Sequence, residues 1–275
     1  MGQSDVAVIG AAGQTGSAVV RALAARGCHP RGLVRRQEQA AVALEAGAGT
    51  TAVCDLADPA TLARGLAGVR AVHLVPPVFH PHEARLVANV RDAATAAGVH
   101  RVVYHSVLHP NTPTMPHHRN KAQGEAELRD SALAWTILQP AMYAQTVLNY
   151  HRRSPAGRLQ APFATDKPFT VVDLADVAEI AATALLEDRG VFGVYELAGP
   201  QVQTVGEMAR QLGATAEHVP PWRLAMPDKI AGRMAYMAAM CEEYSRRGLV
   251  GNGDVARMLL GREPTSFPAA AARGY

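Results

Sequence analysis

Short apolar runs alternate with longer amphipathic segments along the first half of the chain. The apolar runs predict strands at 6–9, 31–34, 50–54, 71–75, 101–106 and 135–138. Helix-compatible segments lie between these runs, for example at 17–23, 83–97 and 120–129. Strands that alternate with helices are typical of a parallel sheet with helices on both faces. The pattern therefore predicts an α/β fold, a doubly wound, Rossmann-like parallel sheet.

The pattern is less regular after residue 140. Prolines mark loops in this part of the chain, and a helix at 174–186 and a strand at 194–198 are predicted from the later pattern. We expect a dinucleotide-binding domain at 1–140. A smaller C-terminal substrate-binding lobe at 141–275 is expected to contribute the late strands and helices.

A glycine-rich turn separates the first strand from the first helix. Glycine lets the backbone bend sharply, approach a pyrophosphate closely and pack the helix against the strand. The N-terminus of the helix then offers unpaired N–H groups to the phosphates, although a simple tight turn is the alternative interpretation. The residues expected to contact the nucleotide here are Gly10, Ala12, Gly13, Gln14, Thr15 and Gly16.

The second strand ends in two arginines where a site for NAD(H) usually carries an acidic residue. A guanidinium group suits a phosphate dianion, whereas a carboxylate would repel it. The sequence therefore favours NADP(H), with Arg35 preferred over Arg36 as the partner of the 2′-phosphate. A solvated basic start of the next helix is the alternative for these residues.

The ends of the later strands line the expected ligand crevice, because the carboxyl ends of parallel strands meet at one edge of the sheet. Asp55 is expected to accept a hydrogen bond from the adenine amino group while Leu56 packs against the ring. The alternative for Asp55 is that it caps the helix that begins near residue 58. Val75, Pro76 and Pro140 are expected to border the cofactor and the floor of the pocket.

Composition restricts the kind of protein without defining its chemistry. The chain has 275 residues, of which 48% are hydrophobic and 19% are charged, as in an ordinary globular protein. No apolar stretch approaches the length of a membrane span, so a cytoplasmic location is expected. The net charge of +3 comes from scattered basic residues, which argues against a nucleic-acid partner. The three cysteines and the histidines show no metal-ligand spacing, so no metal is expected.

Several further segments occur in an order that is more specific than any one of them. In chain order they are Val103-Tyr104-His105-Ser106, His117-His118-Arg119-Asn120-Lys121, Leu138-Gln139-Pro140, the run 172–178 and the run 260–264. Together with the glycine turn and Arg35, they resemble the NmrA-like family of atypical short-chain dehydrogenase/reductases, especially its NADPH:quinone reductases. The resemblance spans almost the whole chain and implies the same fold.

The resemblance also implies the catalytic candidates. Mainstream members of this superfamily use a Tyr-x-x-x-Lys pair, and here His117 occupies the place of the tyrosine while Lys121 lies one helical turn later on the same face. Lys121 would hold the nicotinamide ribose, and Ser106 falls where the catalytic serine of the superfamily tends to lie. His117 is either a general acid or a pocket-lining residue, and His105 and Tyr143 are further candidates to face the pocket.

The resulting hypothesis is an NADPH-dependent reductase that transfers a hydride to a quinone or a related electrophilic, apolar carbonyl compound. One alternative is a redox-sensing regulator that binds NADP(H) without turnover. Another is a biosynthetic tailoring enzyme that reduces a ketone or imine, or that catalyses a step without redox chemistry.

A late segment of the chain is rich in methionine and forms an apolar stripe. It comprises Met226, Met234, Met237 and Met240 with Trp222 and Tyr236. Such a stripe is interpreted as core or as the interface of a homodimer, and as the cover of a broad hydrophobic ligand in the alternative.

Overall fold

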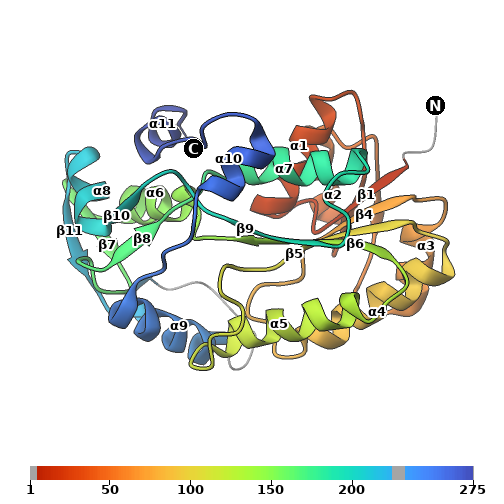
Figure 1. The fold of residues 1–275 in the computed structure, drawn as a ribbon, viewed down its shortest axis with the longest axis horizontal. Coiled ribbons are helices and arrows are strands. Elements are labelled where there is room, and N and C mark those ends of the chain that lie inside the picture. Colours follow the sequence, from red (N-terminus) through yellow and green to blue (C-terminus); the bar gives the residue numbers. More distant parts are fainter. Residues whose placement is uncertain (1–4, 225–232, 275) are drawn as a thin grey trace.

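A seven-stranded parallel sheet forms the centre of the molecule (Figure 1). The structure is a computed structural model that describes residues 5–224 and 233–274. The strands of the sheet, in spatial order, are β3 (Thr50–Val53), β2 (Arg31–Val34), β1 (Val6–Ile9), β4 (Ala71–Leu74), β5 (Arg101–His105), β6 (Ala134–Pro140) and β9 (Gly193–Leu197).

The strand order reverses beside β1. The chain runs outward from β1 to β2 and β3, then crosses back to place β4 on the other side of β1. In such sheets a ligand binds in the crevice outside the carboxyl ends of the strands at this switch point. The prediction of a doubly wound, Rossmann-like sheet is confirmed, and the predicted strands agree with the observed ones to within one or two residues at each end.

Both faces of the sheet are buried, which explains why β1 is apolar throughout rather than alternating. Val6 and Val8 contribute to one core cluster, and Ala7 and Ile9 contribute to the other. All four side chains are at most 4% exposed.

Helices cover both faces of the sheet (Figure 1). The helices of one face are α1 (Gln14–Ala24), α2 (Ala40–Glu45) and α7 (Leu174–Leu186), and those of the other face are α3 (Pro59–Leu66), α4 (Glu83–Ala96) and α5 (Pro116–Arg129). Pairs that pack together include α1 with α7 and α4 with α5. Since α5 begins before the predicted helix at 120–129, it includes His117 as well as Lys121.

The chain after residue 140 forms two small sheets and several helices in addition to β9 and α7. An antiparallel pair joins β8 (Pro168–Thr170) to β10 (Val202–Thr204), and a parallel pair joins β7 (Arg158–Ala161) to β11 (Thr215–His218). The helices of this part are α6 (Ala144–Arg153), α8 (Val205–Gln211), α9 (Arg233–Arg247), α10 (Asp254–Leu260) and α11 (Phe267–Ala272). Within 5–224 and 233–274, no helix is long and apolar enough to cross a bilayer.

Candidate functional site

The turn between β1 and α1 has the geometry of a phosphate-binding turn. Gly10 has a φ of 73°, a backbone conformation that favours glycine. A Cβ on Gly16 would lie 2.1 Å from the carbonyl oxygen of Gly10, so this approach of helix to turn requires glycine. The side chain of Ser17 steadies the turn by donating a hydrogen bond to the carbonyl of Ala11 at 2.9 Å.

The N-terminus of α1 has no side-chain cap from residues 5–224 or 233–274. Gly13 is the N-cap residue and offers no side chain, and no acidic residue lies in the first turn. Gly13 and Gln14 are exposed. The first-turn N–H groups are therefore open to an anion from outside the chain, which fits the pyrophosphate of a dinucleotide.

Arg35 and Arg36 differ in their surroundings at the end of β2. Arg36 lies 3.9 Å from the carboxylate of Glu38, and its backbone N–H donates to the side chain of Gln39 at 3.0 Å. Arg35 is exposed, and its side chain makes no hydrogen bond or ion pair with the residues that the structure describes. The charge of Arg35 acts on the imidazole of His80, whose pKa is lowered mainly by burial. Arg35 thus offers an exposed guanidinium group at the end of β2.

Asp55 and Leu56 follow β3, but they do not line the cavity described below. A carboxylate oxygen of Asp55 accepts a hydrogen bond from the N–H of Ala57 at 2.9 Å. The helix cap is Asp58, which accepts from Ala60, so the alternative of Asp55 as that cap is wrong. Leu56 is buried in the core on the α3 and α4 face of the sheet.

A cavity of about 250 Å³ opens at the carboxyl ends of β4, β5 and β6. The predicted site residues that the structure brings together in its wall are Thr15, Val75, Pro76, Ser106, His117, Lys121 and Pro140. The other predicted residues lie outside its wall, along the ends of β1, β2 and β3; they are Gly10, Ala12, Gly13, Gln14, Gly16, Arg35, Asp55 and Leu56. Thr15, which lies in the first turn of α1, connects the two sets.

Lys121 is held at the polar end of the cavity by two oxygen atoms. Its ammonium lies 2.8 Å from the carboxylate of Glu83 and donates to the carbonyl of His105 at 2.8 Å. The hydroxyl of Tyr104 donates to the same carboxylate at 2.8 Å, and the ammonium lies 5.3 Å from the centre of that ring. The Glu83 side chain is fully buried. An ammonium has three donors, so one N–H of Lys121 remains for a ligand.

Ser106 is bound to a second buried carboxylate. Its hydroxyl donates to Glu125 at 2.5 Å, and the amide of Gln139 donates to the same oxygen at 2.7 Å. Arg129 donates to the other oxygen of Glu125 at 2.5 Å. The hydroxyl proton of Ser106 therefore points into the protein, and its oxygen lone pairs are what remains for the cavity.

His117 lies in the cavity wall and is 4% exposed. Burial, followed by the charge of Lys121, lowers the pKa of this imidazole to about 2. Its ring packs edge to face on Phe79 with 4.7 Å between ring centres. A ring that stays neutral cannot act as an imidazolium acid near neutral pH, so these surroundings favour the pocket-lining interpretation.

Tyr143 connects the cavity to the turn at α1. Its hydroxyl lies 2.5 Å from Nε2 of His105 and 3.2 Å from the hydroxyl of Thr15. Burial raises the pKa of the Tyr143 phenol and lowers the pKa of the His105 imidazole well below its usual value. The phenol is therefore protonated and the imidazole neutral at neutral pH.

Aromatic and aliphatic side chains form the far end of the cavity. They are Leu108, Met142, Tyr150, Phe163, Met240, Tyr244 and Leu249. The rings of Phe163 and Tyr244 meet edge to face at 5.6 Å.

Of the methionine stripe, only Met240 is in this wall among the described residues. Met237 is buried, Met234 and Trp222 are exposed, and Tyr236 is half-buried. Met226 lies outside the described residues.

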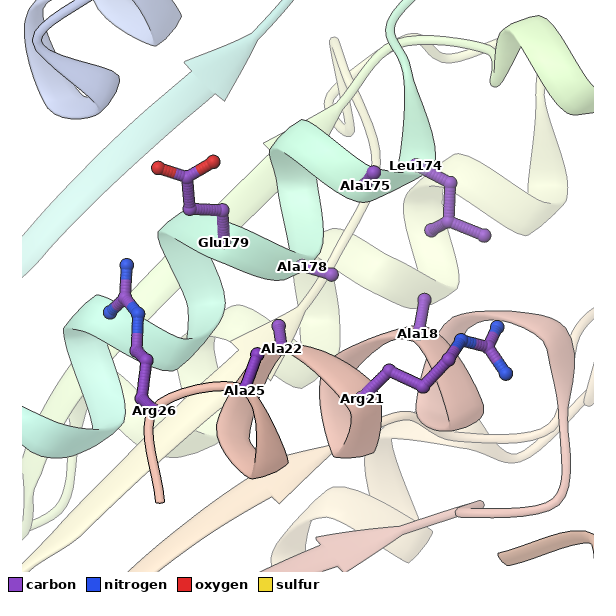
Figure 2. A pocket seen from close by; sticks show the side chains of 9 residues that line it. All are labelled: Ala18, Arg21, Ala22, Ala25, Arg26, Leu174, Ala175, Ala178 and Glu179. Atoms are coloured by element: carbon purple, nitrogen blue, oxygen red, sulfur yellow. The ribbon is translucent and has the colours of Figure 1, made fainter. Parts of the chain in front are cut away.

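Other features of the molecule lie apart from this site. A hollow of about 450 Å³ runs between α1 and α7, lined mostly by alanines with Arg21, Arg26 and Glu179 at its sides (Figure 2). None of the predicted site residues lines it. Cys28, Cys54 and Cys241 are free thiols. Among residues 5–224 and 233–274, no three His, Cys, Asp or Glu side chains are placed to hold a metal ion.

The fold and this crevice define a Rossmann-like protein with a dinucleotide-type turn beside a small apolar cavity. The chain belongs to the NmrA-like family, which matches residues 2–265. The resemblance seen in the sequence is thereby confirmed.

Two relatives and one solved structure extend this comparison. Quinone oxidoreductase 2 of Escherichia coli strain K12 is 31% identical over 212 residues, which cover 75% of this chain and 73% of that protein. NAD(P)H azoreductase of Xenophilus azovorans is 29% identical over 251 residues, which cover 90% of this chain and 81% of that protein. The structure of an NADPH-dependent quinone oxidoreductase from Escherichia coli in complex with NADPH is 26% identical, with a TM-score of 0.83 over 98% of this chain and 99% of that chain. The prediction of an oxidoreductase is confirmed.

Sequence reasoning missed the two buried carboxylates of the site. Glu125 lies four residues after Lys121 on α5, and this spacing was a signal that it shares a helix face with the lysine. Glu83 comes from the first turn of α4 and meets Lys121 across the packing of α4 on α5, for which the sequence offers no local signal.

Proposed function

We propose that this protein reduces quinones or related electrophilic, apolar carbonyl compounds by hydride transfer from NADPH. The observation that carries this proposal is the cavity that runs from the phosphate-binding turn, at Thr15, past Lys121 to an apolar wall. One continuous space can thus hold a nicotinamide end and a hydrophobic acceptor side by side. The names of the relatives as quinone and azo reductases support the same class of reaction.

The nucleotide would lie along the carboxyl ends of β1, β2 and β4. The first-turn N–H groups of Gln14 and Thr15, which no described residue accepts from, suit the pyrophosphate, and the exposed guanidinium of Arg35 suits a 2′-phosphate. The remaining N–H of Lys121 would bind the nicotinamide ribose, with Val75 and Pro76 beside the ring. When it is bound, the reduced nicotinamide supplies the hydride.

The acceptor would lie in the apolar part of the cavity. The cavity of about 250 Å³ lies below the usual range of ligand pockets and would also hold the nicotinamide end, which suits a small, flat acceptor. The wall offers aromatic surface for stacking. An N–H of the neutral His117 ring can donate to an oxygen of the acceptor, whereas the lone pairs of Ser106 can accept from a hydroxyl group of the reduced product. In this proposal residues 1–140 provide the nucleotide side and residues 141–275 provide most of the apolar wall.

Purified protein tests the proposal directly. NADPH consumption is followed by its absorbance with a panel of benzoquinones, naphthoquinones, enones, ketones and imines, and each rate is corrected for a reaction without protein. We expect steady turnover with the quinones and enones. Nucleotide binding measured by calorimetry without turnover of any acceptor would instead support the redox sensor. Turnover confined to ketones or imines would support a tailoring enzyme.

A further inference from the structure

The hydroxyl of Tyr143 occupies the junction between the two halves of the proposed site. Tyr143 precedes α6, His105 ends β5 and Thr15 lies in the first turn of α1, so three separate parts of the chain meet at one phenol. The hydroxyl lies 2.5 Å from Nε2 of His105 and 3.2 Å from Oγ1 of Thr15. All three residues line the cavity.

The surroundings of His105 indicate which of its nitrogens carries the proton. The ring is 6% exposed, and its Nδ1 is buried with no hydrogen-bond partner among the described residues. A neutral imidazole has one N–H and one bare nitrogen. A buried N–H without an acceptor is rarer than a buried acceptor without a donor. The proton therefore belongs on Nε2, which donates to the Tyr143 oxygen.

This tautomer directs the proton of Tyr143 away from His105. The phenol oxygen accepts from Nε2, so its own O–H is left for Thr15 or for a molecule in the cavity. Two other polar groups nearby are less suited to give a proton. The hydroxyl of Ser106 already donates to Glu125 at 2.5 Å, and the ring of His117 is neutral and packs against Phe79.

We propose that Tyr143 is a catalytic residue that donates a proton to the reduced acceptor, and that His105 is the positioning residue that aims it. The proposal rests on the proposed reductase function. Once the acceptor has gained a hydride, its anionic oxygen takes the phenol proton. The O–H bond of Tyr143 breaks and an O–H bond forms on the product. The phenolate is stabilised by the Nε2–H of His105 and the hydroxyl of Thr15 until it regains a proton from water.

The kinetic test is the variant Tyr143→Phe, which removes one oxygen and keeps the ring. General acid catalysis contributes roughly 10²- to 10⁴-fold, so we expect kcat for a quinone to fall by about 10²-fold. The acceptor KM and the Kd for NADPH, measured by fluorescence, should change less than about twofold, because the phenyl ring keeps the shape of the wall. The wild-type solvent isotope effect on kcat should exceed that of the variant. The matched control is Tyr195→Phe, on β9 outside this cavity, which should retain wild-type kinetics.

A second measurement tests the geometry without turnover. Nitrogen-15 spectra of histidine-labelled protein should show His105 as a neutral ring with its proton on Nε2, assigned by its absence in His105→Gln. The Nε2–H signal should shift in Tyr143→Phe and not in Tyr195→Phe. A proton on Nδ1 would overturn the proposal, and so would a Tyr143→Phe variant with wild-type kcat and isotope effect. If wild-type protein turns over no acceptor, the proposed function fails and this proposal fails with it.

Discussion

The two halves of the crevice differ in whether their polar groups are exposed or are buried and paired within the protein. At the ends of β1 and β2, the N-terminus of α1 and the guanidinium of Arg35 are exposed and have no side-chain partner in the part of the chain that the structure describes. At the ends of β5 and β6, the polar groups are buried and mostly paired with one another, as Lys121 is with Glu83 and Ser106 with Glu125.

This difference indicates what each half does with a ligand. The open half has hydrogen-bond donors whose negatively charged acceptor must come from the ligand, so the ligand completes the site. In the other half the desolvation of the ammonium is already offset inside the protein, and the groups are held in position before a ligand arrives. Variants in the paired half should therefore change folding, whereas those at exposed side chains of the open half should change binding.

The largest effect is expected from Glu83→Ala in the paired half. It removes the carboxylate that lies 2.8 Å from Lys121 and leaves the ammonium buried without its counter-charge. Breaking a buried ion pair costs about 3–5 kcal/mol, which should appear in the free energy of unfolding by urea. The control Glu127→Ala breaks a more exposed pair with Arg91 and should cost less than about 1 kcal/mol. Equal losses in the two variants would contradict the buried pair.

Gly16→Ala tests whether the open half also depends on packing. The new Cβ would lie 2.1 Å from the carbonyl oxygen of Gly10, so the turn must move. We expect a loss of about 3 kcal/mol in unfolding free energy without nucleotide, at the upper end of overpacking costs. In Gly13→Ala the nearest atom is 3.3 Å away and the loss should be below about 1 kcal/mol. If Gly16→Ala is as stable as Gly13→Ala, the close contact is not required.

Arg35→Ala should separate binding from folding in the open half. Because the side chain is exposed and makes no ion pair with any described residue, the free energy of unfolding by urea should not change. Hydrogen bonds to charged groups contribute about 1.5–3 kcal/mol, so the Kd for NADPH should rise about 10- to 100-fold while that for NADH stays constant. Arg36→Ala is the matched control and should affect NADPH less. Equal losses for both nucleotides would remove Arg35 from this role.

His73→Leu tests a buried polar group outside both halves, which makes no hydrogen bond with the described residues. His73 is fully buried on β4, both of its ring nitrogens lack a hydrogen bond within the described residues, and burial lowers its pKa to about 3. The folded state therefore excludes a proton that the unfolded state binds below about pH 6.5. The stability linked to this ring is present above pH 6.5 and declines towards pH 3, by up to about 1.4 kcal/mol per pH unit.

The leucine variant lacks this titration, so its unfolding free energy relative to wild type should rise by about 2 kcal/mol between pH 7 and pH 5. Denaturation at both pH values measures the difference, in which the other titrating groups cancel. A difference that does not depend on pH would show that His73 does not exclude the proton.

The regular part of the fold could be predicted because its signals are local. The run at Val6–Ile9 is apolar because both faces of the sheet are covered, and the glycines after it are required by backbone geometry within a few residues. The helix Leu174–Leu186 matches its predicted bounds. Beyond residue 140 the small sheets and α6 were not predicted, because their short elements are stabilised by contacts with distant segments, such as β7 with β11.

The sequence by itself determined the sheet and the glycine turn, since each depends on periodicity or on neighbours along the chain, and the role of Arg35 towards a 2′-phosphate stays a prediction. Only the tertiary structure decided how the chemical groups pair: Glu83 meets Lys121 across two helices, Tyr143 meets His105 and Thr15 from three elements, and burial keeps His117 neutral. The physical reason is that desolvation and hydrogen bonding act through space. Their strength at any one group depends on residues that lie far apart in the chain.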